Sequence, residues 1–235
     1  MTASAKAIEA RGVVKSFGQT PALRGADIEA RKGEILAVMG PSGSGKSTLL
    51  HCLAGILTPD EGAVWFDGER LDTVSEAGRS ALRRERFGFI FQFGQLVPEL
   101  TAEENVALPL LLGGVRRDKA VEEASKWFGR LGLDGLQSRR SGELSGGQAQ
   151  RVALARGLVA GPEIIFADEP TGSLDSVTGE QVMNLLTAAA REQGTTVILV
   201  THEARVAAYA DREVIVRDGK VSTLTGVPGA TELTR

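Results

Sequence analysis

The sequence predicts an α/β fold in which helices cover both faces of a parallel sheet. Apolar runs at residues 35–39, 164–167 and 197–200 have the continuous apolar character of strands that are buried on both faces. Between these runs, apolar residues recur every three or four positions, as on one face of a helix. Two such stripes, which we interpret as core contacts, are Val121, Ala124, Phe128 and Leu131, and Val182, Leu185, Leu186 and Ala189. Alternating strands and helices are typical of a parallel sheet.

The remaining elements follow in chain order. Residues 7–17, 26–30 and 63–66 read as short strands, and 213–216 reads as a late strand before an Asp218-Gly219 turn. The segment from about 95 to 151 has helical patterns but no convincing strand. We therefore predict one domain over residues 1–235, with 95–151 as a helical subdomain inserted in the core.

Composition limits the possible functions. The 235 residues are 42% apolar and 24% charged, which suits one substantial soluble domain. A net charge of −3 argues against binding nucleic acid or anionic lipid through overall charge, although a local basic patch stays possible. Cys52 is the only cysteine, so no intramolecular disulfide can form, as suits a reducing cytosol.

Neither a secretory leader nor a membrane span is expected. The first twelve residues lack a continuous apolar core. The longest lipid-like stretch, 106–115, is about half the roughly 20 residues that a spanning helix needs, and Pro109 interrupts it. If the protein acts at a membrane, another chain must cross it.

A phosphate-binding loop follows the first buried run. Residues 40–48 are Gly40, Pro41, Ser42, Gly43, Ser44, Gly45, Lys46, Ser47 and Thr48. They fit G-x-x-x-x-G-K-S/T between a strand and a helix predicted from about residue 47 to 54. Glycines let backbone N–H groups form a nest for phosphate oxygens, and the helix N-terminus faces those oxygens. Lys46 would reach the β- and γ-phosphates of a nucleotide, and Ser47 would bind Mg²⁺. A Gly/Ser-rich surface turn is the alternative, and the strand–loop–helix context argues against it.

Two carboxylates end the second buried run. Asp168 and Glu169 lie at the carboxyl end of a parallel strand, where side chains face the ligand crevice. Asp168 suits the role of holding Mg²⁺, and Glu169 would polarise the attacking water. A helix-capping Asp is the commoner explanation of such a pair alone, but the upstream phosphate loop favours the functional interpretation.

Ser145, Gly146, Gly147 and Gln148, preceded by Leu144, resemble the signature motif of the ATP-binding-cassette (ABC) family. This motif begins a helix, here expected over 149–160, and its hydroxyl, glycine amides and helix N-terminus make a second anion site. A flexible turn is the alternative. The motif lies about twenty residues before the Asp168 strand, and this position argues against a flexible turn.

Further residues resemble family elements in the same order, so the resemblance covers nearly the whole chain. Phe17 resembles the aromatic platform that stacks on adenine, with a core aromatic as the alternative. Gln92 resembles the Q-loop glutamine that senses Mg²⁺ and water, and residues 173–175 resemble the D-loop. His202 resembles the switch histidine at the γ-phosphate. His51 has no such support, and we interpret it as packing.

The resemblance implies a P-loop NTPase (RecA-like) core, an N-terminal antiparallel β subdomain and an ABC-specific helical subdomain. It also implies a head-to-tail homodimer that sandwiches ATP and Mg²⁺ between residues 40–48 of one copy and 145–148 of the other. The catalytic set would be Lys46, Gln92, Glu169 and His202, and the Mg²⁺ ligands would be Ser47, Gln92 and Asp168.

Within the family, the chain is most similar to ATPases of the lipoprotein-release, macrolide-efflux and FtsE cell-division group. The similar segments are residues 40–50, 96–101, 104–109 and 167–175. Gln148-Ala149-Gln150-Arg151 departs from the usual QQQR, and Glu203 follows His202 where Asp is common.

The resemblance implies an ATPase peripheral to the cytoplasmic side of the membrane, with integral membrane permease subunits as partners. The alternative is a regulatory ATPase that controls an extracytoplasmic enzyme without transporting anything. A soluble repair or translation ATPase and an importer ATPase with a C-terminal domain fit less well, since their extra cassette, coiled coil or domain is not evident. A groove for the permease is expected near residues 92–100, lined by Phe91, Phe93, Leu96 and Val97. The basic cluster 83–86 is expected to be a solvated helix face, with approach to a membrane or permease as the alternative.

Overall fold

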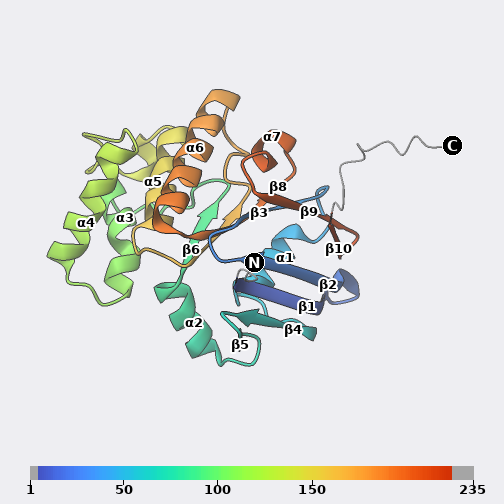
Figure 1. Ribbon diagram of the computed structural model, residues 1–235. Coiled ribbons are helices and arrows are strands. Elements are labelled where there is room, and N and C mark those ends of the chain that lie inside the picture. The colour runs from blue at the N-terminus through green and yellow to red at the C-terminus, as the bar shows by residue number, and fades with distance from the viewer. Residues whose placement is uncertain (1–4, 224–235) are drawn as a thin grey trace.

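The core of the structure is a six-stranded sheet in which five neighbouring strands are parallel. The computed structural model describes residues 5–223 (Figure 1). The strand order is β10-β9-β3-β8-β7-β6, with only the β9–β10 pair antiparallel. The strands are β3 (Ile35–Met39), β6 (Phe87–Phe91), β7 (Ile164–Asp168), β8 (Thr196–Thr201), β9 (Arg212–Arg217) and β10 (Lys220–Thr223). The three apolar runs are thus confirmed as buried neighbouring strands.

A second, antiparallel sheet is built mainly from the first part of the chain, as expected. Its order is β2-β1-β4-β5. The strands are β1 (Lys6–Phe17), β2 (Thr20–Arg31), β4 (Glu61–Phe66) and β5 (Glu69–Arg70). β2 begins six residues before the predicted start at residue 26, because its first half pairs with the end of β1 although it is polar and carries Pro21.

Helices cover the core sheet and form a lobe beside it. They are α1 (Lys46–Leu53), α2 (Glu76–Glu85), α3 (Ala102–Leu112), α4 (Arg117–Arg130), α5 (Gly146–Leu158), α6 (Ser176–Gln193) and α7 (Ala204–Ala207), with a short 3₁₀ turn at Ser141–Glu143. In Figure 1, α3, α4 and α5 lie together at the left, away from the antiparallel sheet. Over residues 95–151 the only β-pairing is one bridge between Thr101 and Arg140, as expected of a helical insertion.

Pro109 lies inside α3, so the proline that interrupts the apolar stretch does not end the helix. Thr101 begins α3 with a capping box, in which its hydroxyl accepts from the Glu104 amide and the Glu104 carboxylate accepts from the Thr101 amide. Among residues 5–223, no helix is long and apolar enough to cross a membrane. The expectations about residues 1–4 and about the chain after residue 223 concern residues outside the described range.

Two apolar cores hold the layers together. One packs β1, β2 and β4 against α1 and one face of the core sheet, and the other packs the opposite face against α3, α4, α5 and α6. Both predicted stripes contribute to the second core. Cys52 on α1 lies in the first core at 1% exposure, and burial raises the pKa of its thiol to about 11.

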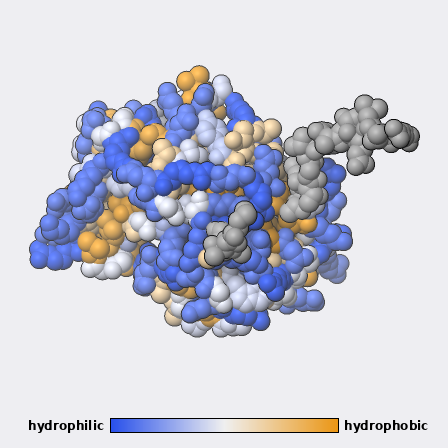
Figure 2. All heavy atoms as spheres, in the orientation of Figure 1, coloured by the Kyte–Doolittle hydropathy of each residue, from blue (hydrophilic) through white to orange (hydrophobic). Residues whose placement is uncertain are grey.

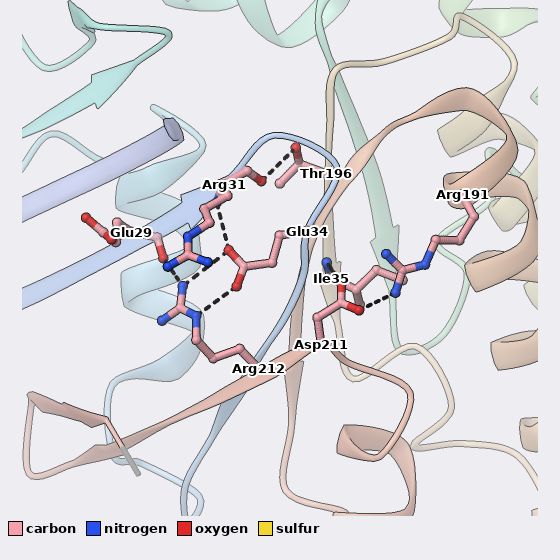
Figure 3. Close-up of polar contacts among 8 residues, drawn as sticks. All are labelled: Glu29, Arg31, Glu34, Ile35, Arg191, Thr196, Asp211 and Arg212. Atoms are coloured by element: carbon pink, nitrogen blue, oxygen red, sulfur yellow. Dashed lines mark hydrogen bonds and ion pairs between the residues drawn. The ribbon is translucent and has the colours of Figure 1, made fainter. Parts of the chain in front are cut away.

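A polar network closes the amino end of the core sheet (Figure 3). Glu34 precedes β3 and is 9% exposed, and its carboxylate accepts from the Arg212 guanidinium at 2.7 Å and from the Arg31 amide at 2.7 Å. Asp211 accepts from the Ile35 amide at 2.9 Å and pairs with Arg191 of α6. These bonds join both sheets and α6 at the end opposite the phosphate loop.

Candidate functional site

The phosphate loop turns at the carboxyl end of β3 and opens α1, as predicted. Gly40, Gly43 and Gly45 have φ of 149°, 76° and 105°, values that side-chain-bearing residues rarely adopt. Gly45 caps α1 without a side-chain hydrogen bond, so the first amides of the helix stay available. The Lys46 ammonium donates to the carbonyls of Gly40 at 2.8 Å and Pro41 at 2.9 Å. A cation held by its own loop, next to free amides, is an anion site.

Two distant segments lie against the phosphate loop, and the sequence did not reveal them. A Cβ on Gly40 would lie 2.1 Å from the Val216 carbonyl oxygen, and one on Gly45 would lie 2.4 Å from that of Ala22. The Gly219 amide donates to the Ser44 carbonyl at 3.0 Å. The β9–β10 turn and the start of β2 therefore shape the phosphate loop.

Asp168 at the end of β7 faces Ser47 across the site. The Ser47 hydroxyl lies near the Asp168 carboxylate, and Asp168 Oδ1 is buried without a hydrogen-bond partner in the described part of the chain. Burial raises the pKa of Asp168, and the nearby Ser47 hydroxyl opposes that rise. A hydroxyl and a carboxylate with an unused oxygen are ligands that suit Mg²⁺. These two residues therefore fit the cation that the sequence predicted.

Glu169 and His202 face each other at the same end of the sheet. His202 Nδ1 lies 2.8 Å from Glu169 Oε1 and 2.7 Å from Oε2. Glu169 has φ of 49°, a left-handed conformation that is strained for a residue with a side chain. The turn directs its carboxylate towards β8, and no such strain is visible in the sequence.

One cavity of about 370 Å³ brings most of these residues together. Its lining consists of Ser42, Gly43, Lys46, Ser47, Phe91, Gln92, Phe93, Gln95, Asp168 and Glu169. Phosphate loop, acidic pair and Gln92, which are up to 127 residues apart in sequence, thus meet in one space.

Several predicted site residues do not line this cavity, among them His202, which contacts Glu169. Phe17 ends β1 at 53% exposure, which excludes the alternative of a core aromatic.

The signature-like residues 145–148 also lie outside the cavity lining and form the first turn of α5, where Ser145 and Gln148 make a capping box. This helix begins three residues before the predicted position, because the two glycines are already helical. Ser145 and Gly146 at its start are exposed.

The loop that carries Gln92 is bound by Ser173, one of the D-loop-like residues, and by Gln150, to which the sequence assigned no role. The Gln92 carbonyl accepts from the Ser173 hydroxyl at 2.7 Å, and the Phe91 carbonyl accepts from Gln150 at 2.9 Å. Gln150 is 1% exposed, and a glutamine is seldom buried so fully unless its amide is bound. Its place on the helix after residues 145–148 was the only available signal.

An apolar groove of about 640 Å³ lies beside this loop, between α2, β6, α3 and α5. Its apolar lining includes Ile56, Phe87, Phe89, Leu108 and Leu112, and Arg83, Arg84 and Arg156 lie along it. Of the residues predicted to line a permease groove, Phe91 lines this one. Phe93 lines the phosphate cavity instead, and Leu96 packs on the helical core. Part of the basic cluster lines the groove, whereas Arg86 pairs with Glu163.

Exposed apolar side chains mark the groove's edges. Ile56 is 41% exposed and Leu112 is 61% exposed. In Figure 2, an orange hydrophobic patch lies over the helical lobe at the left, within a mostly hydrophilic face. Such a patch on a charged surface is typical of a protein-binding site.

The sequence profile of the ABC transporter family matches residues 23–172. The chain is 41% identical over 218 residues to the lipoprotein-releasing system ATP-binding protein LolD of Geobacter metallireducens, covering 91% of this chain and 97% of that protein. It is 45% identical over 219 residues to the macrolide export ATP-binding/permease protein MacB of Nitrosomonas europaea. That match covers 91% of this chain but only 33% of MacB, so the chain spans about a third of that relative.

Solved structures agree with the fold. A dimeric structure of the bacterial ABC transporter cassette MJ0796 superposes with a TM-score of 0.85 at 37% identity, covering 94% of this chain and 100% of that one. A post-hydrolysis dimer of the same cassette, bound to ADP and Pi, gives a TM-score of 0.84. The predicted family and the predicted α/β architecture are both confirmed.

Proposed function

The chain belongs to the ABC transporter family as an ATP-binding cassette with ATPase activity, and we propose that it drives a membrane permease made as a separate chain. The cavity that unites the phosphate loop with Asp168, Glu169 and Gln92 carries this proposal. The similarity to LolD over almost the full length of both chains supports it. The named relatives are transport proteins, which favours transport over purely regulatory control.

Each part of the cavity has a role in this proposal. The amides of residues 40–48 bind the phosphates, with Lys46 at the β- and γ-phosphates. On ATP binding, the phosphates replace the Gly40 and Pro41 carbonyls as hydrogen-bond partners of the Lys46 ammonium. Ser47, Asp168 and Gln92 would hold Mg²⁺, and the cation would neutralise charge on the transferred phosphoryl group. Phe17 stacks on the adenine from its exposed position at the end of β1.

Hydrolysis then depends on Glu169 and His202. Glu169 orients the attacking water in line with the γ-phosphorus and accepts its proton. As the new P–O bond forms, the bond from the γ-phosphorus to the bridging oxygen breaks, so that ADP leaves and phosphate is formed. His202 holds that carboxylate in its left-handed turn and contacts the γ-phosphate. His202 Nδ1 lies within 2.8 Å of both carboxylate oxygens, so one oxygen must be released from the histidine before it can accept the proton of the water.

A second copy completes each site. Ser145, Gly146 and Gly147 at the start of α5 do not line the cavity of their own chain, and the similar MJ0796 cassettes are dimers. Residues 145–148 of one copy bind the ATP that is held by residues 40–48 of the other. Closure on ATP and opening after hydrolysis then transmit force.

The permease binds in the apolar groove at the cytoplasmic face of the membrane. The groove offers apolar walls and exposed edges, and it shares Phe91 and Gln95 with the phosphate cavity. A cytoplasmic helix of the permease with an apolar face fits such a groove.

The test is affinity purification of tagged Glu169→Gln chain from native membranes in MgATP, followed by mass spectrometry. Co-purification of an integral membrane protein that is lost on Leu112→Glu substitution in the groove would support the proposal. Recovery of the permease together with a cell-wall hydrolase would favour the regulatory role instead. Recovery of soluble partners alone would contradict a membrane role.

A further inference from the structure

The loop between β6 and α3 is held mainly through its backbone carbonyls. Those of Gly94 and Gln95 accept from the two terminal nitrogens of Arg156, at 2.7 Å and 2.8 Å. The Gln150 amide donates to the Phe91 carbonyl, and the Ser173 hydroxyl donates to the Gln92 carbonyl. Side chains therefore bind four of the five backbone carbonyls of residues 91–95. Inside the loop, the Gly94 amide donates to Phe91 and the Gln95 amide to Phe93. Its shape is thus set from outside as well as by its own turn.

Arg156 is an unusual donor, because its guanidinium makes no ion pair among residues 5–223. Its two hydrogen bonds in this part of the chain both go to the loop, and burial lowers its pKa. Arg156 is half-buried, and a partly desolvated guanidinium without a carboxylate partner relies on its carbonyl acceptors. A planar fork that binds two successive carbonyls fixes their relative orientation as well as their position.

Helix α5 brings this fork and Gln150 to the loop together. Gln150, Ala153 and Arg156 are spaced three apart and lie on one helix face. A Cβ on Gly94 would lie 3.3 Å from the Ala149 carbonyl oxygen and 3.5 Å from Ala153 Cβ, so the loop lies directly on that face. Any shift of α5 must therefore carry the loop with it.

The Gln92 side chain packs closely against Gly172, in the segment after β7. A Cβ on Gly172 would lie 2.7 Å from Gln92 Nε2 and 3.3 Å from Glu169 Oε2. The side chain of Gln92 therefore lies between the loop and the segment after β7. Its position in the cavity follows from where the loop backbone is held.

We propose that Arg156 is a positioning residue for ATP hydrolysis, which fixes Gln92 in the nucleotide cavity by binding the Gly94 and Gln95 carbonyls from α5. Ser173 supports the same loop from the opposite side. The inference rests on the proposed role of Gln92. Because Arg156 also lines the apolar groove, it links the occupant of that groove to the geometry of the cavity.

The expected effect is on turnover more than on ATP binding. Arg156→Met keeps the aliphatic stem and removes both donors. A loop displaced by about 1 Å can lower kcat by ten- to hundredfold, while KM for ATP changes less than about threefold because the phosphate loop is untouched. Arg156→Lys keeps one donor and should recover part of the loss. The Gly94 and Gln95 amides should also exchange hydrogen faster in Arg156→Met.

Arg79→Gln is the matched control. Arg79 is also partly buried and donates to a backbone carbonyl, but to that of Val74 at 2.9 Å, away from the loop, and it does not line the groove. The full-length chain with this substitution should keep the kcat and the loop exchange of the unsubstituted protein.

A double-mutant cycle with Gln92→Ala decides the question. If Arg156 acts through Gln92, Arg156→Met should lower kcat no further in the Gln92→Ala background. Multiplicative losses would overturn the inference, as would a kcat of Arg156→Met equal to that of Arg79→Gln. Should Arg156→Met fail to fold, the same cycle with Ser173→Ala, at an exposed position, decides by the same criterion. A Gln92→Ala chain at full activity would instead refute the proposed role of Gln92 itself.

Discussion

The two ends of the core sheet treat their polar groups in opposite ways. At the amino end, Glu34, Arg212 and Asp211 satisfy one another and the neighbouring backbone (Figure 3). At the carboxyl end, Asp168 Oδ1 and the Ser44 hydroxyl are buried without a hydrogen-bond partner among residues 5–223. The first end stabilises the fold, whereas the second keeps groups free for a ligand at some cost in stability.

The pKa directions of two aspartates express the same contrast. The hydrogen bond from Arg191 lowers the pKa of Asp211, so its charged form stabilises the fold. Burial raises the pKa of Asp168, so its charged form destabilises the fold. Left-handed Glu169 adds backbone strain at the same carboxyl end.

Glu169→Gln should have the largest effect. We expect kcat for ATP to fall about 10²–10⁴-fold, because the general base is lost, while ATP binding persists and a closed dimer accumulates. Phosphate release and size-exclusion chromatography in MgATP measure both. Glu85→Gln, on an exposed side chain of α2, is the control, and equal turnover of the two variants would contradict the assignment.

Lys46→Ala should weaken ATP binding. Charge-assisted contacts worth about 1.5–3 kcal/mol are lost, which corresponds to a roughly 10- to 150-fold higher Kd. Isothermal titration with a non-hydrolysable ATP analogue gives the value, and Lys126→Ala, on an exposed pair, serves as the control. An unchanged Kd would remove Lys46 from the phosphate site.

Arg212→Met should mainly reduce stability. It leaves Glu34 buried beside one amide, and we expect the free energy of unfolding to fall by about 2 kcal/mol. This is less than for a fully buried pair, because Arg212 is 30% exposed. Urea unfolding measures the change, and kcat at saturating ATP should stay constant. Arg116→Met, on a pair that is 83% exposed at the arginine, should cost under about 0.5 kcal/mol.

The smallest effects should come from neutralising the two aspartates, and their signs should be opposite. Asp211→Asn should lower the free energy of unfolding by about 1 kcal/mol at pH 7, and Asp168→Asn should raise the melting temperature. As pH falls, the gain from Asp168→Asn should fade first, since the pKa of Asp168 lies above 3.8, whereas the loss from Asp211→Asn should persist below that value. Melting temperatures of both variants between pH 3 and 7, a range that brackets the ordinary carboxyl pKa of about 4, test these signs. Shifts of the same sign would refute the contrast between the ends.

The sequence predicted those features that depend on local patterns. Continuous apolar runs located β3, β7 and β8, and the glycine spacing at residues 40–45 located the phosphate loop. Each carries its signal within a few residues. The assigned roles of the individual site residues remain proposals, which the experiments above test.

Features that depend on contacts between distant segments could not be predicted. Nothing near Arg156 indicates that its guanidinium meets a loop 61 residues earlier. The support of Ser44 by Gly219 crosses most of the chain. The apolar groove is a further example, because its walls come from four elements that are spread along the sequence.

The burial of Cys52 has a practical consequence for measuring how the dimer opens and closes. The only thiol of the sequence is 1% exposed and has a pKa of about 11, so it stays protonated and shielded at neutral pH. A cysteine introduced on an outer surface would therefore react alone with a maleimide dye or spin label, without prior removal of the native one. Distances between such labels on two protomers would then track opening and closing in an otherwise unaltered core.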